Sequence, residues 1–206
     1  MTFSTAAGAG GDHSAPPALV LLSAGPVACL AALQQQAAPV LAEVLRLPLR
    51  TPLDPLAPDA ALAALAEGPS GLAPLPRDPG LALADGRHWA AALGAWRQPV
   101  LLLLAAEQLE TGLPAALTAL LRQWQVPCLG LVQWGGPWQP EQRRREGLPW
   151  LGALESSRRW PGSRVAADVG VAGAADAAME ADAERATALR FTCQARWQDL
   201  RHQLYT

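Results

Sequence analysis

The stretch QWGGPW combines two tryptophan rings with a pair of glycines. Its candidate ligand-binding residues are Gln133, Trp134, Gly135, Gly136 and Trp138. It follows a continuous apolar stretch, and ligands of open α/β sheets bind beyond the carboxyl ends of the strands. The two rings could therefore stack on a planar ligand or on a partner's side chain. The alternative is that both rings cap the edge of the sheet as ordinary packing.

A second candidate is the turn SAGPVACLAAL, which follows the apolar run ALVLL near the start of the chain. An α/β nucleotide-binding protein places its phosphate loop between such a strand and the next helix. That loop needs glycines, a lysine that neutralises phosphate, and a Ser or Thr that binds Mg²⁺. This turn has one glycine and a proline without an N–H donor, and the whole chain contains no lysine. We therefore predict a degenerate phosphate-loop position at Ser23, Gly25 and Pro26.

Asp85 and His88, with Arg87 between them, could together do acid–base work. The same residues also fit a helix that begins with Asp85 as its N-cap and exposes its first turn. We expect this second arrangement.

The arginines at 143–145 could bind a phosphate, because a guanidinium group binds it through two hydrogen bonds. They lie between Glu141 and Glu146, so a solvated turn with balanced charges is expected instead. His13 and His202 are isolated, and the chain has no CxxC, HxH, HExxH or GxSxG motif. No metal site, catalytic residue or cofactor is expected.

Composition limits the classes of partner. The chain has 206 residues, half of them apolar, and a net charge of −2, which gives no reason to expect nucleic acid or an anionic membrane. No basic residue precedes Arg46, and the longest strongly apolar run, residues 100–106, is too short to span a bilayer. The cysteines are three, odd in number and far apart, as is typical of reduced thiols. These features predict a cytoplasmic protein with a protein partner or a small ligand.

The elements that would position these residues are clearest in the second half. PVLLLLAA and VPCLGLVQW are apolar without alternation, which predicts strands buried on both faces, and a helix begins at Pro114 between them. LPWLGAL predicts a short last strand. Such β–α–β units form parallel sheets, so we predict an α/β fold with a mostly parallel sheet and flanking helices. The proline-rich residues 47–80 predict a mostly extended surface connection with a short helix at 59–66.

Four segments are expected along the chain: a disordered arm (1–17), an α/β domain (18–154), a linker (155–175) and a C-terminal helix (176–206). Apolar residues form one stripe along that helix: Leu189, Cys193, Trp197, Leu200 and Leu204. The stripe must cover either the protein's own sheet or a partner. Its candidate partner-binding residues are Trp197, Leu200 and Leu204.

Residues 98–154, from the PVLLLLAA strand to LPWLGAL, resemble the C-terminal half of dethiobiotin synthase and its cobyrinic-acid-synthase-type relatives. The resemblance implies a P-loop NTPase-like architecture. One strand of that family ends in an Asn that meets adenine, and this chain has Gln133 and Trp134 there. The family's lysines, which hold the diamine and the carbamate, have no counterpart.

The sequence thus predicts a non-catalytic protein with a degenerate nucleotide site that binds a partner or a ligand. One alternative is a divergent ATP-dependent enzyme that uses backbone amides and arginine alone. Another is a small-molecule-binding domain centred on the Trp134 to Trp138 loop.

Overall fold

The structure is a computed structural model that describes residues 18–154 and 173–205; within 173–205, side chains are described for 183–200. The arm expected at 1–17, and the expected linker up to residue 172, lie outside these ranges.

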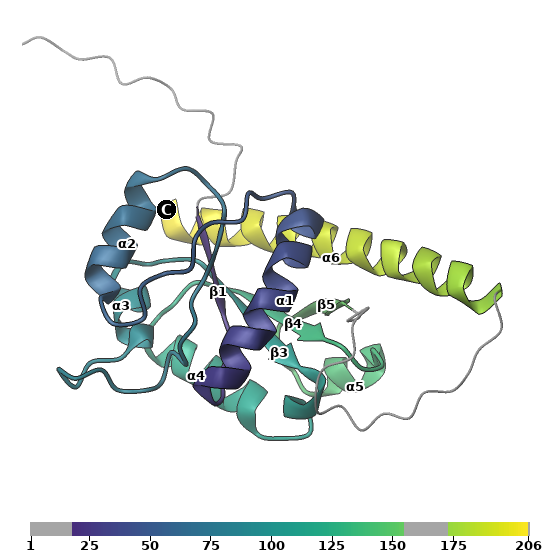
Figure 1. Cartoon of the computed structure of the whole chain (residues 1–206), viewed down its shortest axis with the longest axis horizontal. Helices are drawn as coiled ribbons and strands as arrows, with labels where there is room; N and C mark the ends of the chain where they lie inside the picture. Colours follow the sequence, from purple (N-terminus) through teal and green to yellow (C-terminus); the bar gives the residue numbers. More distant parts are fainter. Residues whose placement is uncertain (1–17, 155–172, 206) are drawn as a thin grey trace, which may run out of the picture.

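The centre of the molecule is a five-stranded sheet in which all neighbouring strands are parallel (Figure 1). The strands are β1 (Leu19–Leu22), β2 (Leu72–Pro74), β3 (Val100–Ala105), β4 (Cys128–Trp134) and β5 (Trp150–Leu154), in the order β2-β1-β3-β4-β5. A parallel bridge between Leu49 and Leu72 adds a further segment outside β2. The prediction of an α/β fold with a mostly parallel sheet is confirmed.

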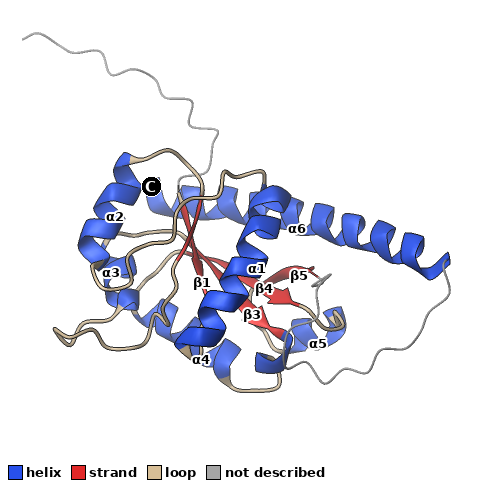
Figure 2. Ribbon diagram, viewed as in Figure 1, coloured by secondary structure: helices blue, strands red, loops and turns tan. Residues whose placement is uncertain are grey.

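Helices cover both faces of the sheet (Figure 2). One face carries α1 (Val27–Leu45) and α6 (Gly173–Tyr205), and the other carries α2 (Pro58–Glu67), α3 (Trp89–Ala95) and α4 (Leu113–Gln123). A 3-10 turn, η1 (Ala106–Gln108), follows β3, and α5 (Pro140–Arg145) lies between β4 and β5. The predicted β–α–β unit of β3, α4 and β4 is therefore present.

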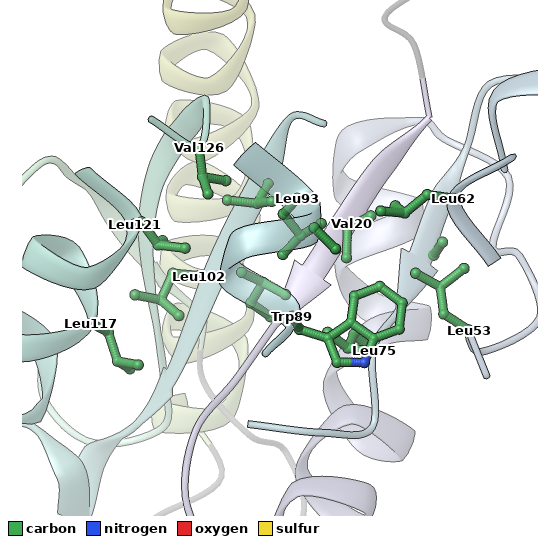
Figure 3. Packing of buried hydrophobic residues seen from close by; sticks show 14 of the residues in the cluster. Val20, Leu53, Leu62, Leu75, Trp89, Leu93, Leu102, Leu117, Leu121 and Val126 are labelled. Carbon is green, nitrogen blue, oxygen red and sulfur yellow. The ribbon is translucent and has the colours of Figure 1, made fainter. Parts of the chain in front are cut away.

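Successive residues of each strand enter opposite layers of the core, because side chains alternate along a strand. Val20 and Leu22 pack with α2, α3 and α4, whereas Leu19 and Leu21 pack with α1 and α6. We call these layers the α2–α4 cluster and the α1/α6 cluster. Figure 3 shows part of the α2–α4 cluster, in which the fully buried Trp89 takes part. Burial on both faces explains why these strands are continuous apolar runs.

The proline-rich region contains a strand that the sequence did not predict. β2 is buried and pairs with β1 along its length. Pro74 is tolerated because the N–H groups of alternate residues point to opposite neighbours. The N–H of Leu72 donates outward to Pro48 O, so position 74, two residues on, needs no donor toward β1.

Two local predictions were wrong. The first is the N-cap of α3, which is His88 rather than Asp85; its side chain accepts a hydrogen bond from Ala91 N. Residues 82–88 form a tight turn at Gly86, where φ is 80°, so the chain becomes helical only at Trp89. The second concerns Pro39, where the sequence predicts that the helix after residue 26 is interrupted; Pro39 instead lies inside one continuous helix, α1.

α1 is long and apolar enough to span a bilayer by length and composition alone. Those two properties do not distinguish a membrane span from a helix of a protein core. Leu33, Ala37 and Leu41 of α1 pack in the α1/α6 cluster.

Candidate functional site

The strand order reverses between β1 and β3. The chain leaves β1, forms β2 on one side of it, and then crosses to form β3 on the other side. In open α/β sheets, ligands bind in the crevice at the carboxyl ends of the strands at such a reversal. The loop after β1 and η1 after β3 meet here, and the loop holds the predicted phosphate-loop residues Ser23, Gly25 and Pro26.

The side chain of Gln108 spans this crevice. Its Nε2 donates to Ala24 O at 2.6 Å, and its Oε1 accepts from Ala105 N at 3.0 Å. A Cβ atom on Gly25 would lie 3.3 Å from Gln108 Nε2. The amide therefore joins the ends of β1 and β3 and fills the space between them.

A carboxylate of the protein accepts a hydrogen bond from the backbone amide of the loop. Gly25 N donates to Asp78 Oδ2 at 3.1 Å, and Asp78 Oδ1 accepts from Gly80 N at 2.9 Å. The next residue, Pro26, has no N–H to offer. The amide group that a phosphate loop would direct at its ligand is thus already hydrogen-bonded to an anion.

Ser23 is turned into the protein. Its side chain is completely buried, and its Oγ accepts from Gln34 Nε2 at 2.8 Å. The same Nε2 also donates to Leu75 O at 2.7 Å, so one amide ties α1 to the ends of β1 and β2. The Ser23 hydroxyl therefore has a structural partner.

Gln133 orders the loop that follows β4. It is completely buried, and its Nε2 donates to Gly135 O at 2.8 Å and to Pro137 O at 3.2 Å. A Cβ atom on Gly136 would lie only 2.8 Å from the Cβ of Ala106, so this loop packs closely on η1. The structure therefore brings Gln133, Gly135 and Gly136 together in one hydrogen-bonded turn.

The two tryptophans of the QWGGPW stretch lie in different packing environments. Trp134 is buried in the α1/α6 cluster. Trp138 is half-buried and packs edge-on against Trp150, with ring centroids 6.3 Å apart. Each ring already packs against other parts of the protein. Of the two roles that the sequence allowed, ligand stacking and ordinary packing, these contacts correspond to ordinary packing.

Arg143 departs from the predicted solvated turn. It is only 4% exposed, pairs with Glu146, and lies with its Cζ 5.1 Å from the centroid of the Trp150 ring. Stacking on an aromatic ring stabilises a guanidinium group as it loses water. Arg144, by contrast, makes the expected exposed ion pair with Glu141 at 2.6 Å.

Asp85, Arg87 and His88 do not form an acid–base pair. Arg87 makes ion pairs with Asp59 at 2.7 Å and with Asp85 at 2.8 Å. Hydrogen bonds from Arg87 lower the pKa of both carboxyl groups, and bonds to Asp59 and Asp85 raise the pKa of Arg87. His88 caps α3, and its ring lies edge-on to Trp124 at 4.9 Å.

The stripe of α6 covers the protein's own sheet. Leu189, Cys193 and Trp197 are buried in the α1/α6 cluster, and Leu200 packs at its border. The side chain of Leu204 lies outside the described residues. Of the two surfaces that the sequence left open, the structure assigns the protein's own sheet to Leu189, Cys193 and Trp197.

A hollow of about 420 Å³ lies at the opposite, amino-terminal ends of β3, β4 and β5. We call it the arginine hollow; its charged lining residues are Arg97, Arg122, Arg196 and Asp199. The sequence did not single out these residues, because they are far apart and follow no recognisable spacing.

No family model matches the chain, and no curated protein matches it. In the part of the chain that the structure describes, no three His, Cys, Asp or Glu residues are grouped so that they could hold a metal ion.

Proposed function

We propose that the protein is a non-catalytic relative of P-loop proteins that acts by binding a partner or a small ligand. The resemblance of residues 98–154 supports the relationship. The loop after β1 lies at the reversal of strand order and before a helix, where open α/β sheets in general bind their ligands. The observation that carries the proposal is the hydrogen bond from Gly25 N to Asp78, beside the Gln108 bridge. The bond to Asp78 uses the N–H of Gly25, which would otherwise be free to donate to a phosphate, and the Gln108 side chain fills the space beside it.

The chemistry of the loop supports the same conclusion. Phosphoryl transfer depends on positive charge and a metal ion at the transferred phosphate. The chain has no lysine, and the hydroxyl of Ser23 accepts a bond from Gln34. Arg77, next to Asp78, donates to Ala82 O at 2.7 Å. The Ser23 hydroxyl and one terminal nitrogen of Arg77 thus make hydrogen bonds within the fold.

The test compares the protein with the variant Val27→Glu. Val27 is 59% exposed at the first position of α1, where an acidic side chain is compatible with the helix but would repel a phosphate in the loop. Turnover of Mg-ATP and Mg-GTP, and the thermal stabilisation by each, are measured for both proteins. A nucleotide at a hundred times its Kd would add about 2.7 kcal/mol.

We expect no turnover above background, and no stabilisation that differs between the two proteins. Turnover or stabilisation that Val27→Glu abolishes would contradict the proposal and favour the ATP-dependent enzyme. Stabilisation that is equal in both proteins would place the nucleotide outside the loop and leave the proposal standing.

A further inference from the structure

Three arginines from separate elements converge on the arginine hollow. Arg97 follows α3, Arg122 lies in the last turn of α4, and Arg196 lies on α6. All three residues are exposed to solvent, so the hollow is open to a ligand. Within the described part of the chain, none of the three guanidinium groups has a hydrogen-bond or ion-pair partner.

We infer that the arginine hollow binds a small polyanion, a molecule that carries several phosphate or carboxylate groups. Its volume of about 420 Å³ is within the range of small-molecule sites. Guanidinium groups bind phosphate and carboxylate through paired hydrogen bonds. Asp199 is the one acid in the lining, so three positive charges face one negative charge.

The remaining lining is compatible with an anion. Cys128 also lines the hollow, and burial raises the pKa of its thiol to about 11, although Arg122 and Arg196 act to lower it. The thiol is therefore neutral at pH 7 and does not repel an anion.

Two residues that line the hollow have an unusual backbone conformation. Arg97 and Gln125 both line it, and both have left-handed backbone conformations, with φ of 48° and 53°. Glycine is the usual residue where a helix ends in this conformation, because a side chain there is strained. Arg46, at the end of α1, has the same conformation without lining the hollow, so this conformation does not by itself point to a ligand.

Attraction to helix ends does not account for the whole cluster. Basic residues near a helix C-terminus stabilise it, and this applies to Arg97 and Arg122. Arg196 lies well inside α6, which continues to Tyr205. The inference goes beyond the proposed function, because it holds whether or not the loop after β1 binds a nucleotide.

The chain offers a matched pair of variants for the test. Arg97→Gly removes one arginine from the hollow and also relieves the left-handed backbone. Arg46 ends α1 in the same conformation, with φ of 56°, and does not line the hollow, so Arg46→Gly is the control. Both variants should be at least as stable as the natural protein, so a loss of binding would not reflect unfolding.

Binding of inorganic pyrophosphate and of citrate is measured by calorimetry at low ionic strength, with sodium chloride of equal ionic strength as the reference. We expect at least one of the two anions to bind. Arg97→Gly should weaken that binding about tenfold, and Arg46→Gly should leave it unchanged. Binding of pyrophosphate alone would identify a phosphate site, and binding of citrate alone a carboxylate site.

Absence of binding by both anions would overturn the inference. Equal weakening in Arg97→Gly and Arg46→Gly would also overturn it, because the effect would then be one of net charge. If Arg97→Gly does not fold, Arg196→Gln replaces it, since that exposed position on α6 tolerates a polar side chain. A negative result in this anion-binding test would not change the outcome of the nucleotide test with Val27→Glu. The two proposals can therefore be refuted independently.

Discussion

The backbone N–H of Gly25 donates a hydrogen bond to Asp78 Oδ2 across 3.1 Å and joins the segments that follow the neighbouring strands β1 and β2. The two residues are far apart in sequence. An acid of the protein thus lies where a phosphate loop would hold an anion of its ligand.

Replacing Asp78 should cost more stability than replacing an acid in a similar but isolated turn. Asp54 Oδ1 accepts from Leu56 N at 2.9 Å, much as Asp78 Oδ1 accepts from Gly80 N. Asp78→Ala also loses the bond to Gly25, so it should lower the free energy of unfolding by about 1 kcal/mol more than Asp54→Ala. Denaturant unfolding measures both. Equal losses would show that the bond to Gly25 contributes nothing.

Gln34 should matter far more than its neighbour Gln35. Gln34→Ala leaves Ser23 Oγ and Leu75 O without their donor inside the protein, and should lower the free energy of unfolding by about 2–3 kcal/mol. Gln35 is exposed, so Gln35→Ala should change it by less than about 0.5 kcal/mol. The same unfolding measurement compares them. Similar values for both variants would argue against the buried amide network.

Trp197 should anchor α6 to the sheet. Trp197→Ala empties a buried site and should cost about 3–5 kcal/mol in unfolding free energy, whereas Phe191→Ala, on the exposed side of the same helix, should cost little. Thermal or denaturant unfolding distinguishes them. A Trp197→Ala protein as stable as the natural one would mean that α6 does not pack on the sheet, and a weakened pull-down would then point to a partner.

The three cysteines should differ in reactivity. Cys29 is exposed, whereas burial raises the pKa of Cys128 to about 11 and that of Cys193 to about 12. At pH 8 a thiol reagent should label Cys29 quickly and the other two slowly, because their thiolates are scarce. Labelling of Cys128 should accelerate as the pH rises toward 11. A fast phase that persists in Cys29→Ser would contradict this assignment.

The sequence predicted the elements whose apolar pattern is local. β3, β4 and β5 are continuous apolar runs, and the parallel sheet follows from the helix between β3 and β4. β2 was missed because only three residues, one of them Pro74, form it among many prolines, and its pairing with β1 is a tertiary contact.

The contacts at the candidate site could be predicted only in part. The poor chemistry of the loop was visible in the missing lysine and in Pro26. Its occupation by Asp78 and Gln108 depends on where distant loops meet in space. The same holds for the hollow, since no spacing rule relates Arg97 to Arg196.

The most direct test of the central claim is the amide signal of Gly25 in a ¹H–¹⁵N correlation spectrum during titration with Mg-ATP. If Asp78 holds this amide, the Gly25 signal should stay in place at nucleotide concentrations that saturate ordinary nucleotide sites. Without nucleotide, the same signal should have a different chemical shift in Asp78→Ala than in the natural protein. A saturable shift of the Gly25 signal with Mg-ATP in the natural protein, absent in Val27→Glu, would contradict the account.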